Sequence, residues 1–265
     1  MRLSLAPVLM AIAVSASLSC APAVAVVERS GAPEASVDEE PPRAESAPAS
    51  ACNEQPPQEF LIRGNYVYKT DVPRAEAQRR KQLHRAAIEY RARRYGFVRG
   101  FGDPAWNPHE PAYYSEVTTF FGIRVRMNAR VIPALRCVEE EIRLACSASP
   151  YAPRLLDGMR FRNTFYDGEV TNHAYGIAID IDPDRNSCCG CVPPLNSWPR
   201  CRQPAATPYE RARIPRCWVD SFAKYGFYWL GNDPIEDTMH FEFLGDPDRI
   251  ARDLTGTGTR RADPR

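Results

Sequence analysis

The sequence predicts an α+β fold in which a small antiparallel sheet is flanked by helices. Helical patterns come early, in residues 74–95 and 133–144, whereas the clearest strand patterns come later, in residues 176–182 and 239–243. This order favours α+β over a doubly wound sheet, in which strands and helices alternate along the chain. The chain has 265 residues, 44% of them hydrophobic and 25% charged, which is enough for one sizeable core in an ordinary globular protein.

The first part of the chain reads as a secretory signal, residues 1–25. Arg2 precedes an apolar, alanine-rich run at 3–14 that is too short to anchor in a bilayer. An Ala-Val-Ala site at 23–25 fits ordinary signal cleavage, while the Ser-Leu-Ser-Cys stretch that ends at Cys20 is an imperfect lipoprotein box. We therefore expect an exported protein, periplasmic or associated with the cell envelope, and a lipid on Cys20 stays an open alternative.

Composition divides the rest of the chain. Residues 26–58 are rich in Pro, Ala, Ser and Glu and have almost no large apolar side chains, so we expect a disordered linker. Residues 255–265 are expected to form a disordered tail. The folded domain is predicted at 59–254, and within it residues 187–217 form a cysteine-rich insertion, which we interpret as a disulfide-pinned loop.

The cysteine count supports disulfides. There are nine cysteines, so an even eight remain when Cys20 is set aside. The cluster in the insertion also suggests a structural zinc site, but an exported protein favours disulfides because its compartment is oxidising. Eight cysteines allow about a hundred pairings, so none is assigned. A local pair between Cys137 and Cys146 is one possibility.

Three further patterns define the predicted elements. The helix at 74–95 is opened by Pro73 and closed by Gly96. Residues 133–144 have their apolar side chains on one side, as an amphipathic helix requires. Residues 117–127 alternate well enough to indicate strand character.

Two of the four histidines lie in or beside short strand patterns. His84, in the basic helix, and His109, in a proline-flanked loop, are expected to be structural or exposed. The other two histidines are His173, just before the strand pattern at 176–182, and His240, within the pattern at 239–243. Each of these strands has one apolar face. The opposite face carries Asp180 in the first strand and His240 with Glu242 in the second. If these strands pair, Asp180 and His240 lie side by side, with about 5 Å between their Cβ atoms.

This constellation predicts a catalytic zinc site. A single histidine on a strand is more often a hydrogen-bonded structural residue than a ligand, so the hypothesis depends on the joint pattern. His173 approaches from the loop before the first strand, and two imidazoles with one carboxylate are a usual ligand set for Zn²⁺ with one position open to water. The helix-borne HExxH motif of the common zinc proteases is absent from the sequence.

A hydrolytic zinc site also needs a base and a group that stabilises the oxyanion. Asp237, three residues before His240 in a turn-forming stretch, is the best candidate for the base, and the neighbouring Glu236 is the alternative. The oxyanion requires a cation, which Arg162 or Arg160 could supply.

Two segments resemble one peptidase family. TNHAYGIAID, at 171–180, resembles the S-x-H-x-x-G-x-A-x-D signature of the D-alanyl-D-alanine carboxypeptidase family. This family includes vancomycin-resistance-type carboxypeptidases and phage L-alanyl-D-glutamate endolysins. KYGFYWLGNDPIEDTMHFEF, at 224–243, is similar to the family's second block, in which G-F-x-W-G-G leads into D-x-M-H-F-E. The resemblance implies a hedgehog/D-Ala-D-Ala peptidase-like fold.

The resemblance also implies roles for particular residues. His173, Asp180 and His240 would bind zinc, Asp237 would be the catalytic acidic residue, and Arg162 most nearly matches the substrate-polarising arginine, with Arg160 as the alternative. The sequence departs from the pattern in three places. Thr171 replaces the usual serine but keeps the hydroxyl, residues 230–232 read Leu-Gly-Asn where the family has a Gly-Gly step, and the cysteine-rich insertion is additional.

The expected activity is that of a zinc metallopeptidase acting on peptidoglycan stem peptides, in the first place a D-Ala-D-Ala carboxypeptidase. An L-Ala-D-Glu-type endopeptidase with the same site is the first alternative, and a non-catalytic cell-wall-binding module is the second. The net charge of +1 gives no indication of a nucleic-acid partner. We expect a monomer.

Overall fold

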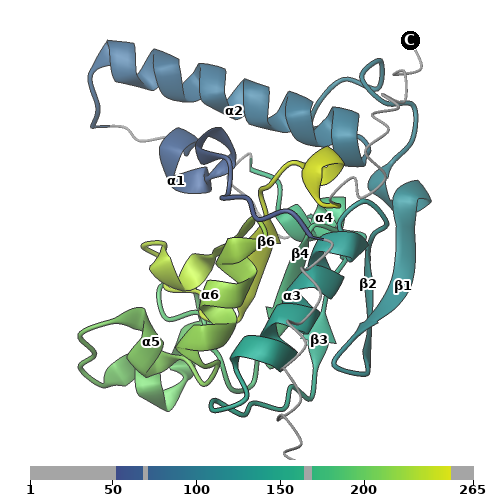
Figure 1. Cartoon of the computed structure of the whole chain (residues 1–265). Coiled ribbons are helices and arrows are strands. Elements are labelled where there is room, and N and C mark those ends of the chain that lie inside the picture. Colours follow the sequence, from purple (N-terminus) through teal and green to yellow (C-terminus); the bar gives the residue numbers. More distant parts are fainter. Residues whose placement is uncertain (1–51, 68–70, 164–168, 252–265) are drawn as a thin grey trace, which may run out of the picture. The chain divides into compact units, whose positions relative to one another are not determined.

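The computed structural model describes residues 52–67, 71–163 and 169–251, all within the unit Pro48–Arg265 (Figure 1). The predicted signal with Cys20, the linker as far as residue 51 and the predicted tail lie outside these residues. Within them, every helix is too short or too polar for the hydrocarbon core of a membrane.

Two antiparallel sheets make up the β part of the fold. The smaller is a hairpin of β1 (Ser115–Phe120) and β2 (Ile123–Asn128). The larger has the strand order β3-β4-β6-β5, with bounds Leu156–Asp157, Ala178–Ile181, His240–Phe243 and Phe227–Trp229. The central strands β4 and β6 are far apart in the sequence, and their register pairs Asp180 with His240. The predicted α+β class and this strand pairing are confirmed.

The helices flank the sheets. α2 (Arg74–Tyr95) begins after Pro73 and ends at Gly96, as predicted, and α3 (Ile132–Ala145) extends the predicted helix by one residue at each end. The shorter helices are α1 (Arg63–Tyr66), α4 (Asn172–Tyr175), α5 (Pro208–Arg211) and α6 (Arg216–Lys224), and the 3-10 segments are η1 (Glu59–Leu61), η2 (Pro111–Tyr114), η3 (Leu195–Ser197), η4 (Pro199–Arg202), η5 (Leu230–Asn232) and η6 (Pro247–Arg249).

The main core lies between the larger sheet and the pair α3 and α6 (Figure 1). α6 directs Trp218 and Phe222 inward, and the Phe222 ring stacks on Phe241 of β6 with 4.1 Å between centroids. Burying side chains of this size stabilises the fold by roughly 1.5–3 kcal/mol each. The isoleucines of β4 are buried in the same core.

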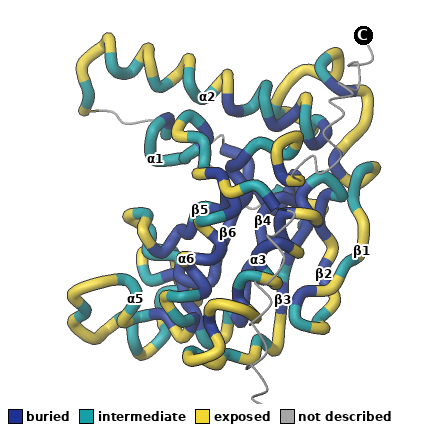
Figure 2. Tube along the Cα trace, viewed as in Figure 1, coloured by how far each residue is buried: buried dark blue, intermediate teal, exposed yellow. Residues whose placement is uncertain are grey.

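The opposite face of β4 is buried as well. Figure 2 shows β4 and β6 in the dark blue of buried residues, and Asp180 is only 3% exposed. Asp180 therefore does not lie at the surface, although the polar face of its strand would allow it. Its face of the sheet is covered by α4 and by the segment that follows β3, because Arg160 of that segment contacts both Asp180 and the backbone of His173.

The predicted strand at 117–127 is two strands joined by a tight turn. The two turn residues are Phe121 and Gly122, with φ of 50° and 79°. Positive φ at both positions is what a two-residue hairpin turn requires. The prediction missed the turn because phenylalanine rarely adopts this conformation and continues the apolar alternation.

All eight described cysteines form disulfides: Cys52–Cys137, Cys146–Cys217, Cys188–Cys191 and Cys189–Cys201. The preference for disulfides over a structural zinc is confirmed. Two of the disulfides lie within the insertion, and Cys146–Cys217 joins its last residue to the end of α3. The possible Cys137–Cys146 pair is wrong. Cys146 lies nine residues after Cys137, just past the end of α3. A rise of about 1.5 Å per residue separates the two by roughly 13 Å, about twice the reach of a disulfide.

The end of the predicted linker belongs to the fold. Cys52 is bonded to α3 through Cys137, and the Gln55 side chain hydrogen-bonds to Asp246 in both directions. Gln58 donates to the Leu244 carbonyl. The folded part therefore begins before residue 59, and composition hid this because polar glutamines make the contacts.

Candidate metal centre

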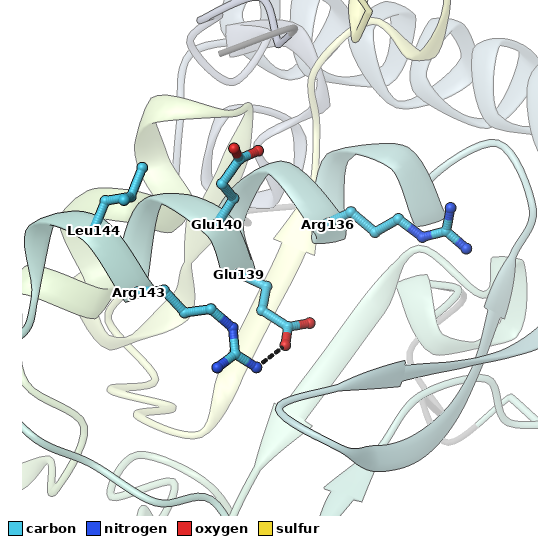
Figure 3. A pocket seen from close by; sticks show the side chains of 5 residues that line it. All are labelled: Arg136, Glu139, Glu140, Arg143 and Leu144. Atoms are coloured by element: carbon cyan, nitrogen blue, oxygen red, sulfur yellow. Dashed lines mark hydrogen bonds and ion pairs between the residues drawn. The ribbon is translucent and has the colours of Figure 1, made fainter. Parts of the chain in front are cut away.

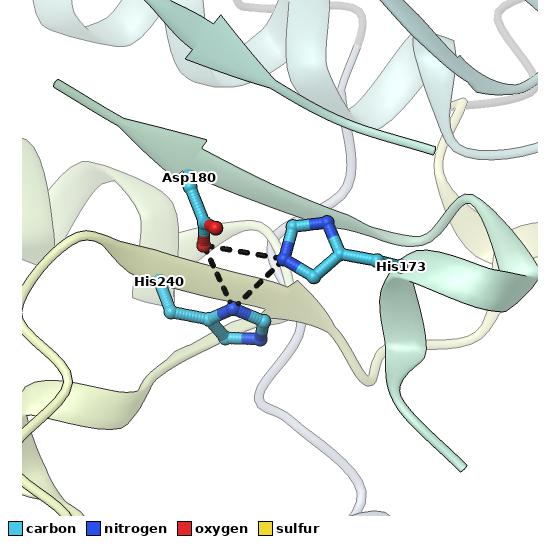
Figure 4. Close-up of side chains that lie close together, drawn as sticks. All are labelled: His173, Asp180 and His240. Atoms are coloured by element: carbon cyan, nitrogen blue, oxygen red, sulfur yellow. Dashed lines mark hydrogen bonds and ion pairs between the residues drawn. The ribbon is translucent and has the colours of Figure 1, made fainter. Parts of the chain in front are cut away.

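Three side chains from separate parts of the chain converge in the interior. His173 lies on α4, Asp180 on β4 and His240 on β6 (Figure 4). His173 Nε2 lies 3.2 Å from Asp180 Oδ1 and 3.1 Å from His240 Nδ1, and this Nδ1 lies 2.9 Å from the same oxygen. All three residues are buried. The structure thus brings together the three residues that the sequence nominates as metal ligands.

A one-turn helix presents His173. The Thr171 side chain caps α4 by accepting a hydrogen bond from the His173 N–H, so the hydroxyl that threonine shares with serine has a structural use. Gly176 ends the turn with φ of 71°. A Cβ atom there would lie 2.9 Å from the Asn128 nitrogen, so both the conformation and the close approach require glycine.

Each candidate ligand has a second atom that is engaged elsewhere. His173 Nδ1 hydrogen-bonds to the Gly158 carbonyl, His240 Nε2 lies 3.4 Å from Glu242 Oε2, and Asp180 Oδ2 accepts from Arg160. Such outer partners fix the tautomer and orientation of metal-bound histidines. With the outer atoms engaged, the remaining atom of each side chain is directed at the common point.

The donor set fits a divalent metal ion. Ligand atoms at about 2.0–2.1 Å from a tetrahedral zinc lie roughly 3.3 Å apart. The three observed separations of 2.9, 3.1 and 3.2 Å are close to this value. Imidazole nitrogens and a carboxylate oxygen are donors that zinc accepts. Three protein ligands leave one coordination position for water or substrate.

The electrostatics of the metal-free site favour a cation. Burial lowers the pKa of His240, but Asp180 and Glu242 outweigh burial and raise it to about 10. Burial raises the pKa of Asp180, but the two histidines hold it well below its usual value. Carboxylates that stay ionised around the convergence point attract positive charge, either a proton on histidine or a metal ion.

Asp237 lies beside the three candidate ligands. It precedes β6, and its Oδ1 is shielded from solvent and has no hydrogen-bond partner among the described residues. Burial raises the pKa of this carboxyl group to about 7, with His240 lowering and Asp180 raising it as smaller effects. A carboxyl group that titrates near neutrality can both accept and donate a proton.

The alternative base, Glu236, is directed elsewhere. Its carboxylate lies 3.3 Å from the Arg211 guanidinium, and its φ is 46°. The structure therefore places Asp237 rather than Glu236 at the candidate centre.

Of the two candidate arginines, Arg160 lies at the site. Its Nη2 donates to Asp180 Oδ2 over 2.5 Å, and its Nε donates to Asp157 Oδ2 over 2.7 Å. Arg162 is exposed, and no contact between it and the candidate ligands is found in the described part of the chain. Sequence spacing did not distinguish the two because both follow β3 in irregular structure.

A pocket of about 210 Å³ adjoins the site. Arg160 and Ala174, the neighbour of His173, are part of its wall. The remaining lining residues come from the loop after α2, from η2 and from the segment after β3: Phe97, Val98, Arg99, Glu110, Pro111, Ala112, Met159, Phe161 and Asn163. A different hollow, on the outer surface of α3, holds the Arg143–Glu139 ion pair and none of the candidate ligands (Figure 3).

The other two histidines are structural or partly exposed, as expected. His84 stacks on Tyr66 with 5.3 Å between ring centroids, and His109 stacks on Tyr113 with 3.9 Å.

Three partners of the site were not anticipated as partners. The sequence indicated that Glu242 lies on the same strand face as His240, and this shared face was the one sign that the two side chains could meet. Gly158 acts through its backbone carbonyl, which no side-chain pattern reveals. Asn172 donates to Glu242 Oε2 over 2.6 Å, and its position beside His173 gave no indication of this contact.

Comparison with known proteins agrees with the geometry. A family model described as D-alanyl-D-alanine carboxypeptidase matches residues 167–243, which include the three candidate ligands and Asp237 but neither arginine. Searches of curated proteins and of solved structures found no significant match. The match supports a peptidase of the D-Ala-D-Ala carboxypeptidase type. The segment that carries the candidate metal centre is thus similar to the D-alanyl-D-alanine carboxypeptidase family.

Proposed function

We propose that the protein is a zinc-dependent peptidase of peptidoglycan stem peptides that removes the last residue of a D-Ala-D-Ala terminus. One observation carries the proposal: donor atoms of His173, Asp180 and His240 converge on one point, with the Asp237 carboxyl group beside them. The family match adds the carboxypeptidase type.

Asp237 is the proton-transfer group of this proposal. When bound, zinc polarises a carbonyl group and lowers the pKa of water to about 7. Asp237 accepts a proton from the attacking water through its shielded Oδ1 as the water oxygen bonds to the carbonyl carbon. It then donates that proton to the leaving amine as the C–N bond breaks. The pKa of about 7 suits both transfers.

Arg160 takes the role for which Arg162 was first nominated. Its guanidinium is held by Asp157 and Asp180, so its charge is fixed beside the candidate ligands before substrate arrives. A preorganised cation stabilises an oxyanion more effectively than one that must first be ordered.

The adjoining pocket supports an exopeptidase. A carboxypeptidase must hold the free terminal carboxylate of its substrate. Arg99 lines the pocket together with Arg160, and the Arg99 side chain is 90% exposed, with Glu110 at 4.0 Å. This cation is accessible to a substrate carboxylate.

The location remains part of the proposal. Four disulfides fit a protein that folds outside the cytoplasm. We place it in the periplasm or at the cell envelope, as a monomer, with a lipid on Cys20 as an alternative to soluble export.

Mass spectrometry of purified muropeptides tests the activity. We expect the loss of one terminal alanine, abolished by a chelator and restored by zinc. An internal cut would instead identify the L-Ala-D-Glu-type or another endopeptidase. Wall binding without cleavage of any muropeptide would overturn the peptidase proposal and leave the binding module.

A further inference from the structure

The start of the cysteine-rich insertion is paired with the loop that carries Asp237. Cys188 forms an antiparallel bridge with Asp237. Backbone hydrogen bonds continue the pairing on both sides, with Cys189 N donating to Glu236 O (3.1 Å), Gly190 N to Ile235 O (2.7 Å) and Thr238 N to Ser187 O (3.2 Å). Residues 187–190, which we call the clamp, therefore run antiparallel to residues 235–238.

One disulfide of the insertion lies against the Asp237 side chain. Cys188 and Cys191 are bonded to each other, and their sulfur atoms and an Asp237 carboxylate oxygen all lie within 4.8 Å of one another. The three residues have the composition of a metal site, but oxidised cysteines do not ligate metal. The disulfide is therefore a packing surface for the carboxylate.

The clamp approaches the Asp237 loop too closely for any side chain at Gly190. A Cβ atom there would lie 2.7 Å from both the Cα and the carbonyl oxygen of Ile235. Glu236, between Ile235 and Asp237, has φ of 46°, a conformation that costs energy for a residue with a side chain and persists where its surroundings impose it. The clamp supplies such surroundings.

Few polar contacts within the loop orient Asp237. Its N–H donates to the Leu230 carbonyl over 3.1 Å, and its carboxylate accepts from the Met239 N–H. Its Oδ1, the atom assigned to proton transfer, has no hydrogen-bond partner among the described residues. The direction of that oxygen is therefore set by the backbone and by the surface packed against it.

We infer that the clamp and its Cys188–Cys191 disulfide form a positioning element, which holds the Asp237 carboxylate beside the candidate metal centre. This inference rests on the proposed function, in which Asp237 moves the proton. It assigns a task to the insertion, which departs from the family pattern. Cys188 and Cys191 act through Asp237 and do not touch the substrate.

Paired alanine substitutions test the inference. In the Cys188→Ala/Cys191→Ala variant we expect kcat on a D-Ala-D-Ala peptide to fall about tenfold or more, because small displacements of a catalytic group cost this much. KM is expected to stay within about twofold and bound zinc, measured by elemental analysis, at the wild-type level. The matched control, Cys146→Ala/Cys217→Ala, removes a disulfide outside the clamp. Below its unfolding transition it should keep kcat within about twofold.

The Asp237→Ala background shows whether the disulfide acts through Asp237. There, removal of Cys188 and Cys191 should have no further effect on kcat, because two changes that disable one group are not additive. Equal losses in both backgrounds, or an equal loss in the control variant, would overturn the inference.

A second variant covers the case in which the cysteine variant does not fold. Gly190→Ala keeps every disulfide but presses on Ile235, so it should also lower kcat and retain zinc. Gly64→Ala is its control, since the nearest atom to a Cβ there is 3.8 Å away. Wild-type protein that cleaves no peptide overturns the proposed function and the inference together. An active wild type whose Gly190→Ala variant keeps its kcat overturns the inference alone.

Discussion

Asp237 combines two properties of a general base, a pKa near neutrality and a shielded oxygen. Asp237→Asn keeps the size of the side chain and removes its ability to take a proton. We expect kcat to fall by about 10²–10⁴-fold, the usual contribution of general acid–base catalysis, while bound zinc is retained. Steady-state kinetics and metal analysis check this. Glu236→Gln is the matched control, and it should stay near wild type because Glu236 pairs with Arg211.

His240 should couple the proposed zinc binding to pH. Its pKa of about 10 in the metal-free chain means that the ring carries a proton at pH 7, although burial opposes this, because Asp180 and Glu242 stabilise the charge. A histidine must be neutral to ligate zinc, so binding releases about one proton and strengthens as pH rises. Calorimetry in buffers of different ionisation enthalpy measures the release. A binding enthalpy independent of the buffer would contradict this prediction.

At the residue scale, the sequence identified the candidate metal ligands more readily than the groups that contact them. His173, Asp180 and His240 were found because donor side chains interrupt or precede regular strand patterns. Arg160 was not separated from Arg162, since both lie in a segment without periodicity. The contact with the Gly158 carbonyl was not predictable, because it depends on the path of the backbone.

Asp182 fixes the end of β4. It is fully buried, and its carboxylate accepts hydrogen bonds from the Tyr151 hydroxyl (2.6 Å) and from the N–H groups of Arg154 (2.7 Å) and Leu155 (2.8 Å). Burial raises the pKa of Asp182, but these hydrogen bonds outweigh burial and lower it. The side chain therefore joins the strand that carries Asp180 to the segment leading into β3.

We expect Asp182→Ala to lower the free energy of unfolding at pH 7 by about 2–4 kcal/mol, because it leaves buried donors unpaired. The folded-state pKa is depressed, so this stabilisation is present above the unfolded value of about 4 and is lost as pH falls through the folded value. The difference in unfolding free energy between Asp182→Ala and the wild type should therefore become smaller as the pH falls. Urea unfolding at several pH values measures it, and a difference independent of pH would contradict the argument.

Asp184→Ala is the control for that prediction. Its carboxylate pairs with Arg154 at the surface, where both side chains are about 60% exposed. Exposed pairs contribute about 0–1 kcal/mol, so little change is expected.

Elements with strong periodicity were predicted and short ones were not. The residues that flank α2 and the apolar face of α3 predicted where these helices begin and end to within about one residue. β3 and β5 have two and three residues, too few for a period to appear. The pairing of β4 with β6 entered the sequence analysis as a condition, and the observed register meets it by placing Asp180 opposite His240.

At the scale of the whole molecule, the disulfides fall into two kinds. Cys52–Cys137 and Cys146–Cys217 join residues 85 and 71 positions apart, whereas Cys188–Cys191 and Cys189–Cys201 span 3 and 12. Sequence could not assign the long pairs, because they depend on how α3 packs against α6 and against the start of the fold. A disulfide that closes a long loop removes more entropy from the unfolded chain than one that closes a short loop.

Removing a long-loop disulfide should therefore change mainly stability, whereas removing Cys188–Cys191 should change mainly kcat. For the Cys52→Ser/Cys137→Ser variant, loop closure alone predicts a loss of about 4.6 kcal/mol in unfolding free energy. Polar contacts of Gln55 with Asp246 and of Gln58 with Leu244 should keep part of the segment in place. kcat below the unfolding transition should stay near wild type, because this bond lies outside the candidate centre. The Cys188→Ala/Cys191→Ala variant should show the reverse, a small change in stability with a large loss of kcat. Thermal unfolding and kinetics on both proteins make the comparison. If the long-loop variant lost kcat while its melting temperature was unchanged, stability and catalysis would not be divided between the disulfides in this way.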